Sequence, residues 1–248
     1  MAVLLADASP GFMAILTISA VVVSIGIFVA FVLAFVRRQA RLRSEGFMEA
    51  LEDQLSGADL EFSQEDSLGR CERLQEFKVG SVGRRRKVSN VVSGVWEGRE
   101  VLCCDYRYVV GHGKHQRAYS QTILIMNLVR PFPPFVMGPE GFFAKIAQVF
   151  GASDIDFQTH PEFSKSYVLK GKDEEGVRAA FSFDLLEYFE AQRGLTLESH
   201  DGLVLFYRVN KRCKPAALEA FFGEGFEVLD ALAGKFPAAS SSGPEGQL

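Results

Sequence analysis

The sequence lacks charge over a long stretch near its amino end: no charged side chain lies between Gly11 and Val36. The 25 residues 12–36 would form about 37 Å of helix, enough to cross a hydrocarbon core of about 30 Å with some tilt. A soluble protein would need a far larger domain to cover a helix that is apolar on every side. The run therefore predicts a transmembrane helix.

Lysine and arginine are missing before this run, whereas four arginines follow it closely. A cleaved signal peptide would show the reverse order and a shorter apolar core of about 7 to 15 residues. Positive residues next to a membrane span stay on its cytosolic side. We therefore expect a single-pass inner-membrane protein with its amino terminus outside and its carboxyl-terminal domain in the cytoplasm. We also expect lipid headgroup contacts from the four juxtamembrane arginines, Arg37, Arg38, Arg41 and Arg43.

Cysteine is scarce as well. Four cysteines in 248 residues are too few for a disulfide scaffold, and the expected cytosolic side is reducing, so free thiols are predicted. The opposite orientation would allow one or two disulfides. Cys103 and Cys104 are adjacent in a predicted strand and would point to opposite faces, so one metal ion cannot readily bind both.

The sequence contains no nucleotide-binding glycine loop and no catalytic set that names a reaction, so we assign no cofactor and no enzymatic activity. The chain holds 27 basic and 31 acidic residues. Setting aside the four juxtamembrane arginines and Asp7 leaves 23 basic against 30 acidic residues, a net charge of −7. A domain with this balance is repelled by nucleic acid, which we exclude as a partner.

Beyond the anchor, strand and helix patterns alternate, and this predicts an α+β fold class. Strands are expected over residues 88–96, 101–110 and 119–128, as an antiparallel β-meander in which the even-numbered face of the middle strand forms the core. Pro131, Pro133 and Pro134 are expected to end that sheet. The predicted parts are an anchor (1–43), a helical extension and linker (44–59), a β-rich unit (60–130), a second α+β unit (131–236) and a disordered tail (237–248).

The second unit shows shorter patterns. A phenylalanine-rich helix led by Pro139 is expected over residues 138–150. The other expected elements are a strand at 166–170, a helix at 174–191, paired strands at 195–198 and 203–209, and a helix at 215–233.

Several short strings occur together in this chain: residues 94–98 (GVWEG), 105–108 (DYRY), 111–114 (GHGK), 121–122 (QT), 154–157 (DIDF) and 161–164 (PEFS). Together they resemble a bacterial protein family with no assigned activity, and the likeness covers residues 60–209. The resemblance implies a bacterial origin and a single membrane anchor with a cytosolic α+β domain. It transfers no catalytic residue, and it implies ordinary apolar strand residues in relatives where this chain has Cys103 and Cys104.

Two groups of residues have the chemistry of a reactive or metal site. Asp154, Asp156, His160 and Glu162 form the densest cluster, and the two aspartates would share one side of an extended segment. Such carboxylates could bind a divalent cation or act in acid-base catalysis, but a capped loop before Pro161 is the interpretation we prefer. His112 and His115 are spaced like half of a zinc site, but no second half is visible, which favours a solvated loop.

A dense basic run interrupts the otherwise acidic domain: Arg84, Arg85, Arg86 and Lys87. Each such residue near an anionic bilayer contributes about 1 kcal/mol, so the run could contact lipid headgroups. A solvated strand edge whose charges discourage aggregation is the alternative.

We therefore expect a protein- or peptide-binding or scaffolding module tethered to the inner face of the membrane, with the lipid bilayer and an unknown protein as partners. One alternative is a membrane-associated hydrolase or metal-dependent enzyme that uses the cluster from Asp154 to Glu162. The other is a module that senses anionic lipid through Arg84 to Lys87.

Overall fold

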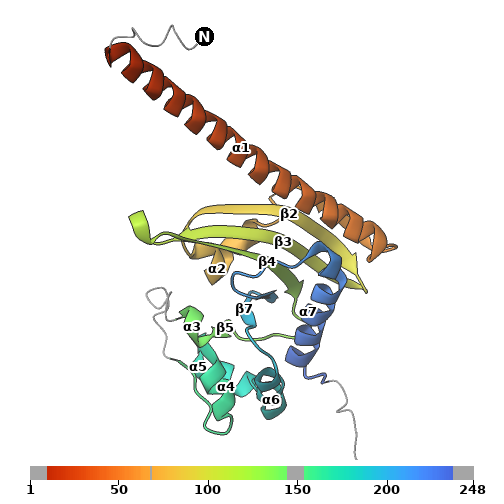
Figure 1. The fold of residues 1–248 in the computed structure, drawn as a ribbon. Helices are drawn as coiled ribbons and strands as arrows, with labels where there is room; N and C mark the ends of the chain where they lie inside the picture. The colour runs from red at the N-terminus through yellow and green to blue at the C-terminus, as the bar shows by residue number, and fades with distance from the viewer. Residues whose placement is uncertain (1–9, 68, 144–153, 237–248) are drawn as a thin grey trace, which may run out of the picture. The chain divides into compact units, whose positions relative to one another are not determined.

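The computed structural model describes residues 10–67, 69–143 and 154–236. The chain divides into two compact units, Met1–Gly46 and Phe47–Leu248. The fold class is α+β, as predicted: a long apolar helix precedes an eight-stranded antiparallel sheet and several short helices (Figure 1). We call the second unit, which contains the whole sheet, the α+β unit.

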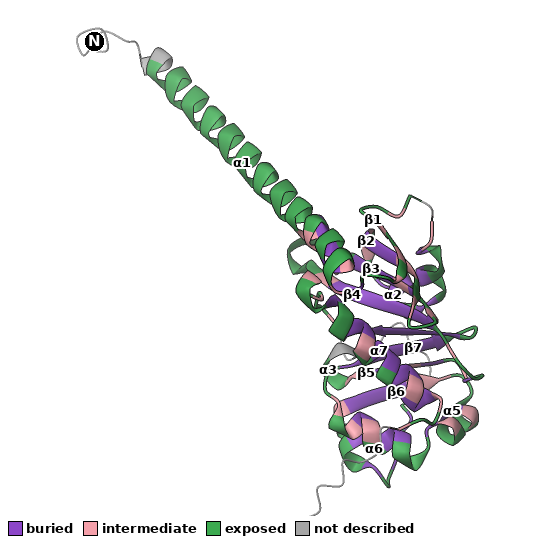
Figure 2. Cartoon of the chain, turned by 90° about the vertical axis from the view of Figure 1, so that its right-hand side faces the viewer, coloured by how far each residue is buried: buried purple, intermediate pink, exposed green. Residues whose placement is uncertain are grey.

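Helix α1 (Pro10–Asp53) is 44 residues long. All residues from 13 to 42 are exposed on every side of the helix (Figure 2). The hydroxyls of Thr17 and Ser24 donate hydrogen bonds to carbonyls about one turn back, which satisfies them within the helix. Of the residues described, one helix is long and apolar enough to cross a membrane; its most apolar stretch has a mean hydropathy of 2.8, and none of that stretch is buried.

The α+β unit contains the remaining elements. Its strands are β1 (Asp59–Ser63), β2 (Arg84–Trp96), β3 (Arg99–Val110), β4 (Arg117–Asn127), β5 (Phe135–Pro139), β6 (Tyr167–Gly171), β7 (Thr196–His200) and β8 (Leu203–Tyr207). Its helices are α2 (Lys78–Ser81), α3 (Glu140–Phe143), α4 (Pro161–Ser166), α5 (Glu174–Ala180), α6 (Phe183–Ala191) and α7 (Leu218–Leu232). Its 3₁₀ turns are η2 (Glu72–Glu76), η3 (Gly113–His115) and η5 (Pro215–Ala217).

One sheet runs through both segments that the sequence separates near residue 130. Its strand order is β1-β2-β3-β4-β8-β7-β5-β6, and every neighbouring pair is antiparallel. The two segments meet where β4 pairs with β8, from Ile123 opposite Tyr207 to Asn127 opposite Leu203. The prediction that Pro131, Pro133 and Pro134 end the sheet was wrong, because these prolines lie in the connection to β5 and none of them needs to donate to a ladder.

Both faces of the sheet are buried, which the sequence analysis did not expect. Cys104, Tyr106 and Tyr108 lie in one apolar cluster, on the even-numbered face of β3 that was predicted to be core. Cys103 on the opposite face belongs to the larger cluster, which includes residues of α7. Since adjacent strand residues point to opposite faces, each of the two neighbouring thiols enters a different core.

The predicted helices hold in outline but differ at their ends. The helix expected over residues 174–191 is two helices, because Ser182 begins a new one: its hydroxyl accepts a hydrogen bond from the Leu185 amide, as an N-cap does. Pro139 is the last residue of β5 and directly precedes α3, which begins at Glu140. Of the helix expected over residues 138–150, the structure shows α3; residues 144–150 lie outside the described residues, as does the tail at 237–248.

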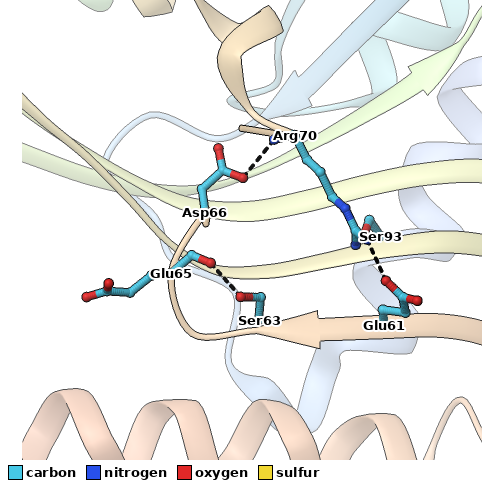
Figure 3. Close-up of polar contacts among 6 residues, drawn as sticks. All are labelled: Glu61, Ser63, Glu65, Asp66, Arg70 and Ser93. Carbon is cyan, nitrogen blue, oxygen red and sulfur yellow. Dashed lines mark hydrogen bonds and ion pairs between the residues drawn. The ribbon is translucent and has the colours of Figure 1, made fainter. Parts of the chain in front are cut away.

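A short connection between β1 and η2 is held by polar contacts (Figure 3). The Asp66 carboxylate accepts hydrogen bonds from the backbone amides of Arg70 and Cys71, at 2.8 and 2.9 Å. The Arg70 guanidinium pairs with Glu61 and donates to the Ser93 hydroxyl on β2. These contacts place Cys71 in the same apolar cluster as Cys104.

Candidate functional site

The basic run predicted from the sequence lies at the start of β2. Strand β1 pairs only with residues 91–95 of β2, so Arg84 to Lys87 are bonded to β3 on one side alone. The pairing with β3 is irregular between Arg84 and Lys87, and Arg85 has a φ of 51° there. The Arg86 guanidinium donates to the carbonyls of Ser81 and Gly83, which fixes its position at the sheet end.

Further cations gather at this end of the sheet, where β3 ends, β4 begins and β8 ends. Lys87 lies opposite Arg107, which in turn lies opposite Ser120. The Ser120 amide donates to the side chain of Asn210, so the segment after β8 continues the row. We call the whole set the basic belt: Arg84, Arg85, Arg86, Lys87, Arg107, Lys114, Arg117, Lys211, Arg212 and Lys214.

The charge of the basic belt is not compensated locally. The three segments that carry it, residues 84–87, 107–117 and 208–214, contain no acidic residue. None of the belt side chains forms an ion pair with another described residue. By contrast, Arg70, Arg99 and Arg178 elsewhere in the unit each pair with a carboxylate. The belt is therefore a local positive field on an acidic unit.

A groove of about 220 Å³ opens within the belt, beside the segment after β8. Lys211, Arg212 and Lys214 line one part of it, and the apolar side chain of Phe221 lines another. Arg208 also lines the groove but is paired with Glu224 at 2.5 Å. Three cations thus remain free of ion pairs with described residues around a concave, partly apolar surface.

A second groove, of about 280 Å³, lies at the opposite end of the same strands. Val95, Leu102, Ile125 and Leu203 give it an apolar lining, and Arg73 and Glu100 stand among its other lining residues. Val95 is 38% exposed. We call this the apolar groove; no histidine or cysteine lines it.

The predicted acidic cluster is not drawn into one site. Ile155 is buried between exposed Asp154 and Asp156, in agreement with the predicted alternation. Partial desolvation raises the pKa of Asp154 and the nearby Asp156 carboxylate raises it further, whereas the hydrogen bond that Asp154 accepts from the Leu169 amide opposes the shift.

The other two members of that cluster have separate partners. His160 is buried, with its ring 4.5 Å from that of Phe183 and Nδ1 3.0 Å from the Thr159 hydroxyl. Glu162 is paired with Lys165 at 2.7 Å, which lowers the pKa of Glu162. Neither groove includes any member of the cluster.

Of the two loop histidines, His112 directly precedes η3 and His115 is its last residue; both are exposed, and the His115 amide donates to the His112 carbonyl. Among the described residues, no group of three histidine, cysteine, aspartate or glutamate side chains is placed to hold a metal ion. The juxtamembrane arginines lie on α1, where Arg41 pairs with Glu45 one turn later.

The structure also brings together residues that sequence reasoning missed. Cys71 and Cys104 lie within hydrogen-bonding reach, and this contact, together with burial, raises the pKa of the Cys104 thiol. No local pattern signalled the pair, because the two cysteines are far apart in the sequence.

A buried carboxylate on β7 was missed as well. Glu198 accepts hydrogen bonds from the Tyr207 hydroxyl at 3.0 Å and from the backbone amides of Lys78 and Val79, at 2.6 and 3.1 Å. Burial raises the pKa of Glu198 to about 7, although these hydrogen bonds oppose the shift. The only sequence signal was an acidic residue at the end of an apolar strand. Glu198 holds the start of α2 against the sheet.

Comparison with known proteins adds one structure. No protein-family model matches the chain, and no curated protein does. The crystal structure of the mycobacterial trehalose monomycolate transport factor A, TtfA, aligns with a TM-score of 0.48 and 13% sequence identity, over 82% of this chain and 99% of that chain. The alignment assigns no residue of this chain a role.

Proposed function

We propose that the chain is a single-pass membrane protein that presents its α+β unit at the inner face of the membrane, where the unit binds another protein or a peptide. One observation carries the anchoring: every described side chain of α1 from residue 13 to residue 42 is exposed, on all sides of the helix. Exposing this apolar surface to water would cost a large free energy, whereas burying it in a bilayer avoids that cost. The arginines that follow the apolar run favour a cytoplasmic α+β unit.

The grooves on the surface of the α+β unit support a binding role. The apolar groove is lined by no serine, cysteine or histidine that could act as a nucleophile. In the groove within the basic belt, the Cys213 thiol donates to the carbonyls of Lys214 and Ala217, and Glu224 is paired with Arg208. The apolar groove exposes Val95 next to polar Arg73 and Glu100. An apolar centre with a polar rim is the usual anatomy of a protein interface.

The anchor makes a weak interface sufficient. Tethering a binding module to a membrane raises its effective concentration toward other membrane-bound proteins by orders of magnitude. A small groove such as this one, which buries little area, therefore does not need high intrinsic affinity.

The test is site-specific photo-crosslinking of the full chain in its native membrane. A photo-crosslinking amino acid at position 95 should give a discrete adduct with one protein. The same amino acid at Val129, which is 60% exposed and does not line the apolar groove, should give none. With the photo-crosslinking amino acid moved to a neighbouring position of the apolar groove, the substitution Val95→Glu should abolish the protein adduct, whereas Val129→Glu should not.

Equal adducts at both positions, or none at either, would remove the apolar groove from the proposal. Turnover of a small molecule by the purified chain, without any protein adduct, would replace the binding role by an enzymatic one.

A further inference from the structure

The uncompensated charge of the basic belt requires an explanation beyond the stability of the sheet. A charged strand edge that prevents aggregation would account for Arg84 to Lys87, which lie beyond the part of β2 paired with β1. It does not account for Arg107, whose strand is paired on both sides. Nor does it account for Lys211, which belongs to an irregular segment joined to β4.

The belt extends across neighbouring strands rather than along one segment of the chain. Lys87, Arg107 and Ser120 lie at one level on three neighbouring strands, and the segment after β8 is bonded to the last of them. Neighbouring strands are about 4.8 Å apart, so this row extends over roughly 15 Å. An array of this breadth matches a surface that presents many anionic groups at once.

The rest of the domain has the opposite charge to the basic belt. Without the ten cations of the basic belt, residues 44–248 hold 13 basic against 30 acidic residues, a net charge of −17. An anionic surface therefore repels the rest of the unit and attracts this one end, which imposes an orientation. The groove of about 220 Å³ within the belt adds a concave place for a single headgroup beside the apolar Phe221.

We propose that the basic belt docks the α+β unit onto the anionic lipid headgroups of the membrane that α1 spans. This inference rests on the membrane anchoring of the proposed function, because the anchor keeps the unit within reach of the bilayer at all times. Docking holds the belt end of the sheet on the lipid. The apolar groove, at the opposite end of the same strands, then stays accessible to a partner.

Lysine footprinting tests the docking with the full chain. The chain is reconstituted into vesicles of phosphatidylcholine alone or with about a third of phosphatidylglycerol, and its lysines are acetylated with a membrane-impermeant reagent. Lys87, Lys114 and Lys211 should react several-fold more slowly in the anionic vesicles, and high salt should abolish the difference. Lys172 and Lys235, which are exposed and lie outside the belt, should react equally in both.

Two matched variants, each with three charges removed, complete the test. The belt variant Arg84→Gln, Lys87→Gln, Arg107→Gln should lose the protection of Lys114 and Lys211. The control variant Lys172→Gln, Arg193→Gln, Lys235→Gln, whose residues are exposed and line neither groove, should keep it. Trp96 fluorescence reports whether each variant is folded, because the Trp96 ring packs 5.0 Å from that of Phe226 in the core.

The outcomes separate the two proposals. A chain that resists alkaline extraction but shows equal lysine reactivity in both vesicle types overturns the docking and leaves the anchor intact. A chain that alkaline extraction releases overturns both. If the belt lysines are protected from acetylation in native membranes but in neither vesicle type, the basic belt binds an acidic protein instead, and the proposed lipid contact is overturned.

Discussion

Lys87 and Arg107 lie directly opposite one another on β2 and β3, and both are exposed. Like charges that face each other across an antiparallel pair destabilise a sheet by a few tenths of a kcal/mol to about 1 kcal/mol. The fold thus tolerates a local cost at the centre of the basic belt. Surfaces that bind often carry such a cost, because a residue arrangement that suits a partner need not suit stability.

Replacing Lys87 with an acid should have opposite effects on the stability of the fold and on its contact with lipid. Lys87→Glu places an acid opposite Arg107 and should raise the free energy of unfolding by about 0.5 kcal/mol. The same change should weaken the protection of Lys114 by anionic vesicles. Urea unfolding followed by Trp96 fluorescence measures the first effect, and lysine footprinting measures the second. A variant that is less stable and docks as well as the original chain would contradict the role given to the pair.

Glu198 predicts a pH dependence of stability. Its folded pKa of about 7 lies above the ordinary value of 4.5, so the folded state binds the proton more tightly than the unfolded state. Protonation of Glu198 therefore contributes fully to the free energy of unfolding below about pH 4.5, and this contribution is lost as the pH rises through about 7. It is on the order of 3 kcal/mol.

Glu198→Gln removes this titration while its side-chain oxygen can still accept from the Lys78 amide. The original chain should lose free energy of unfolding between pH 5 and pH 8, and the variant should lose less. Urea unfolding of both proteins at both pH values measures the difference. A stability difference that is the same at pH 5 and pH 8 would show that Glu198 does not titrate in this range.

Two glycines of α7 give a matched test of the larger core. A Cβ at Gly225 would lie 2.4 Å from Leu124 Cδ2, whereas a Cβ at Gly223 would meet no atom within 4 Å. Gly225→Ala should cost roughly 1 to 3 kcal/mol by overpacking. Gly223→Ala should stabilise the helix by up to about 1 kcal/mol. If both substitutions stabilise the unit equally, α7 does not pack on β4 as described.

The thiols should differ sharply in reactivity. Cys71, Cys103 and Cys104 are buried, and the pKa of Cys104 is raised, so these three should react slowly with a maleimide in the folded chain. Cys213 is partly exposed and should react first. Mass spectrometry of a time course resolves the order. Labelling of Cys104 as fast as Cys213 would mean that the second face of the sheet is open to solvent.

The sequence was most informative where local pattern decides structure. The uncharged run before Arg37 predicted the exposed part of α1, because length and apolarity alone mark a helix for the bilayer. The alternation of residues 101–110 predicted β3, and the expected β-meander corresponds to the antiparallel neighbours β2, β3 and β4. These features depend only on neighbours in the chain.

The remainder depends on long-range pairing. No local signal predicts that β4 pairs with β8, and this pairing brings Asn210, the neighbour of Lys211, to the level of Arg107. For the same reason the sequence showed only the four cations of residues 84–87 instead of the ten-residue belt. The burial of Glu198 was hidden too, because it depends on α2, which is 120 residues earlier in the chain.

The most direct test of the account is protease digestion of the full chain on each side of a bacterial inner membrane, after an alkaline wash. We predict that the chain stays with the membrane. Protease should leave it essentially intact in right-side-out spheroplasts and should reduce it to a small amino-terminal fragment in inside-out vesicles. Recovery of the chain in the wash, or removal of the α+β unit by protease added to intact spheroplasts, would contradict the account.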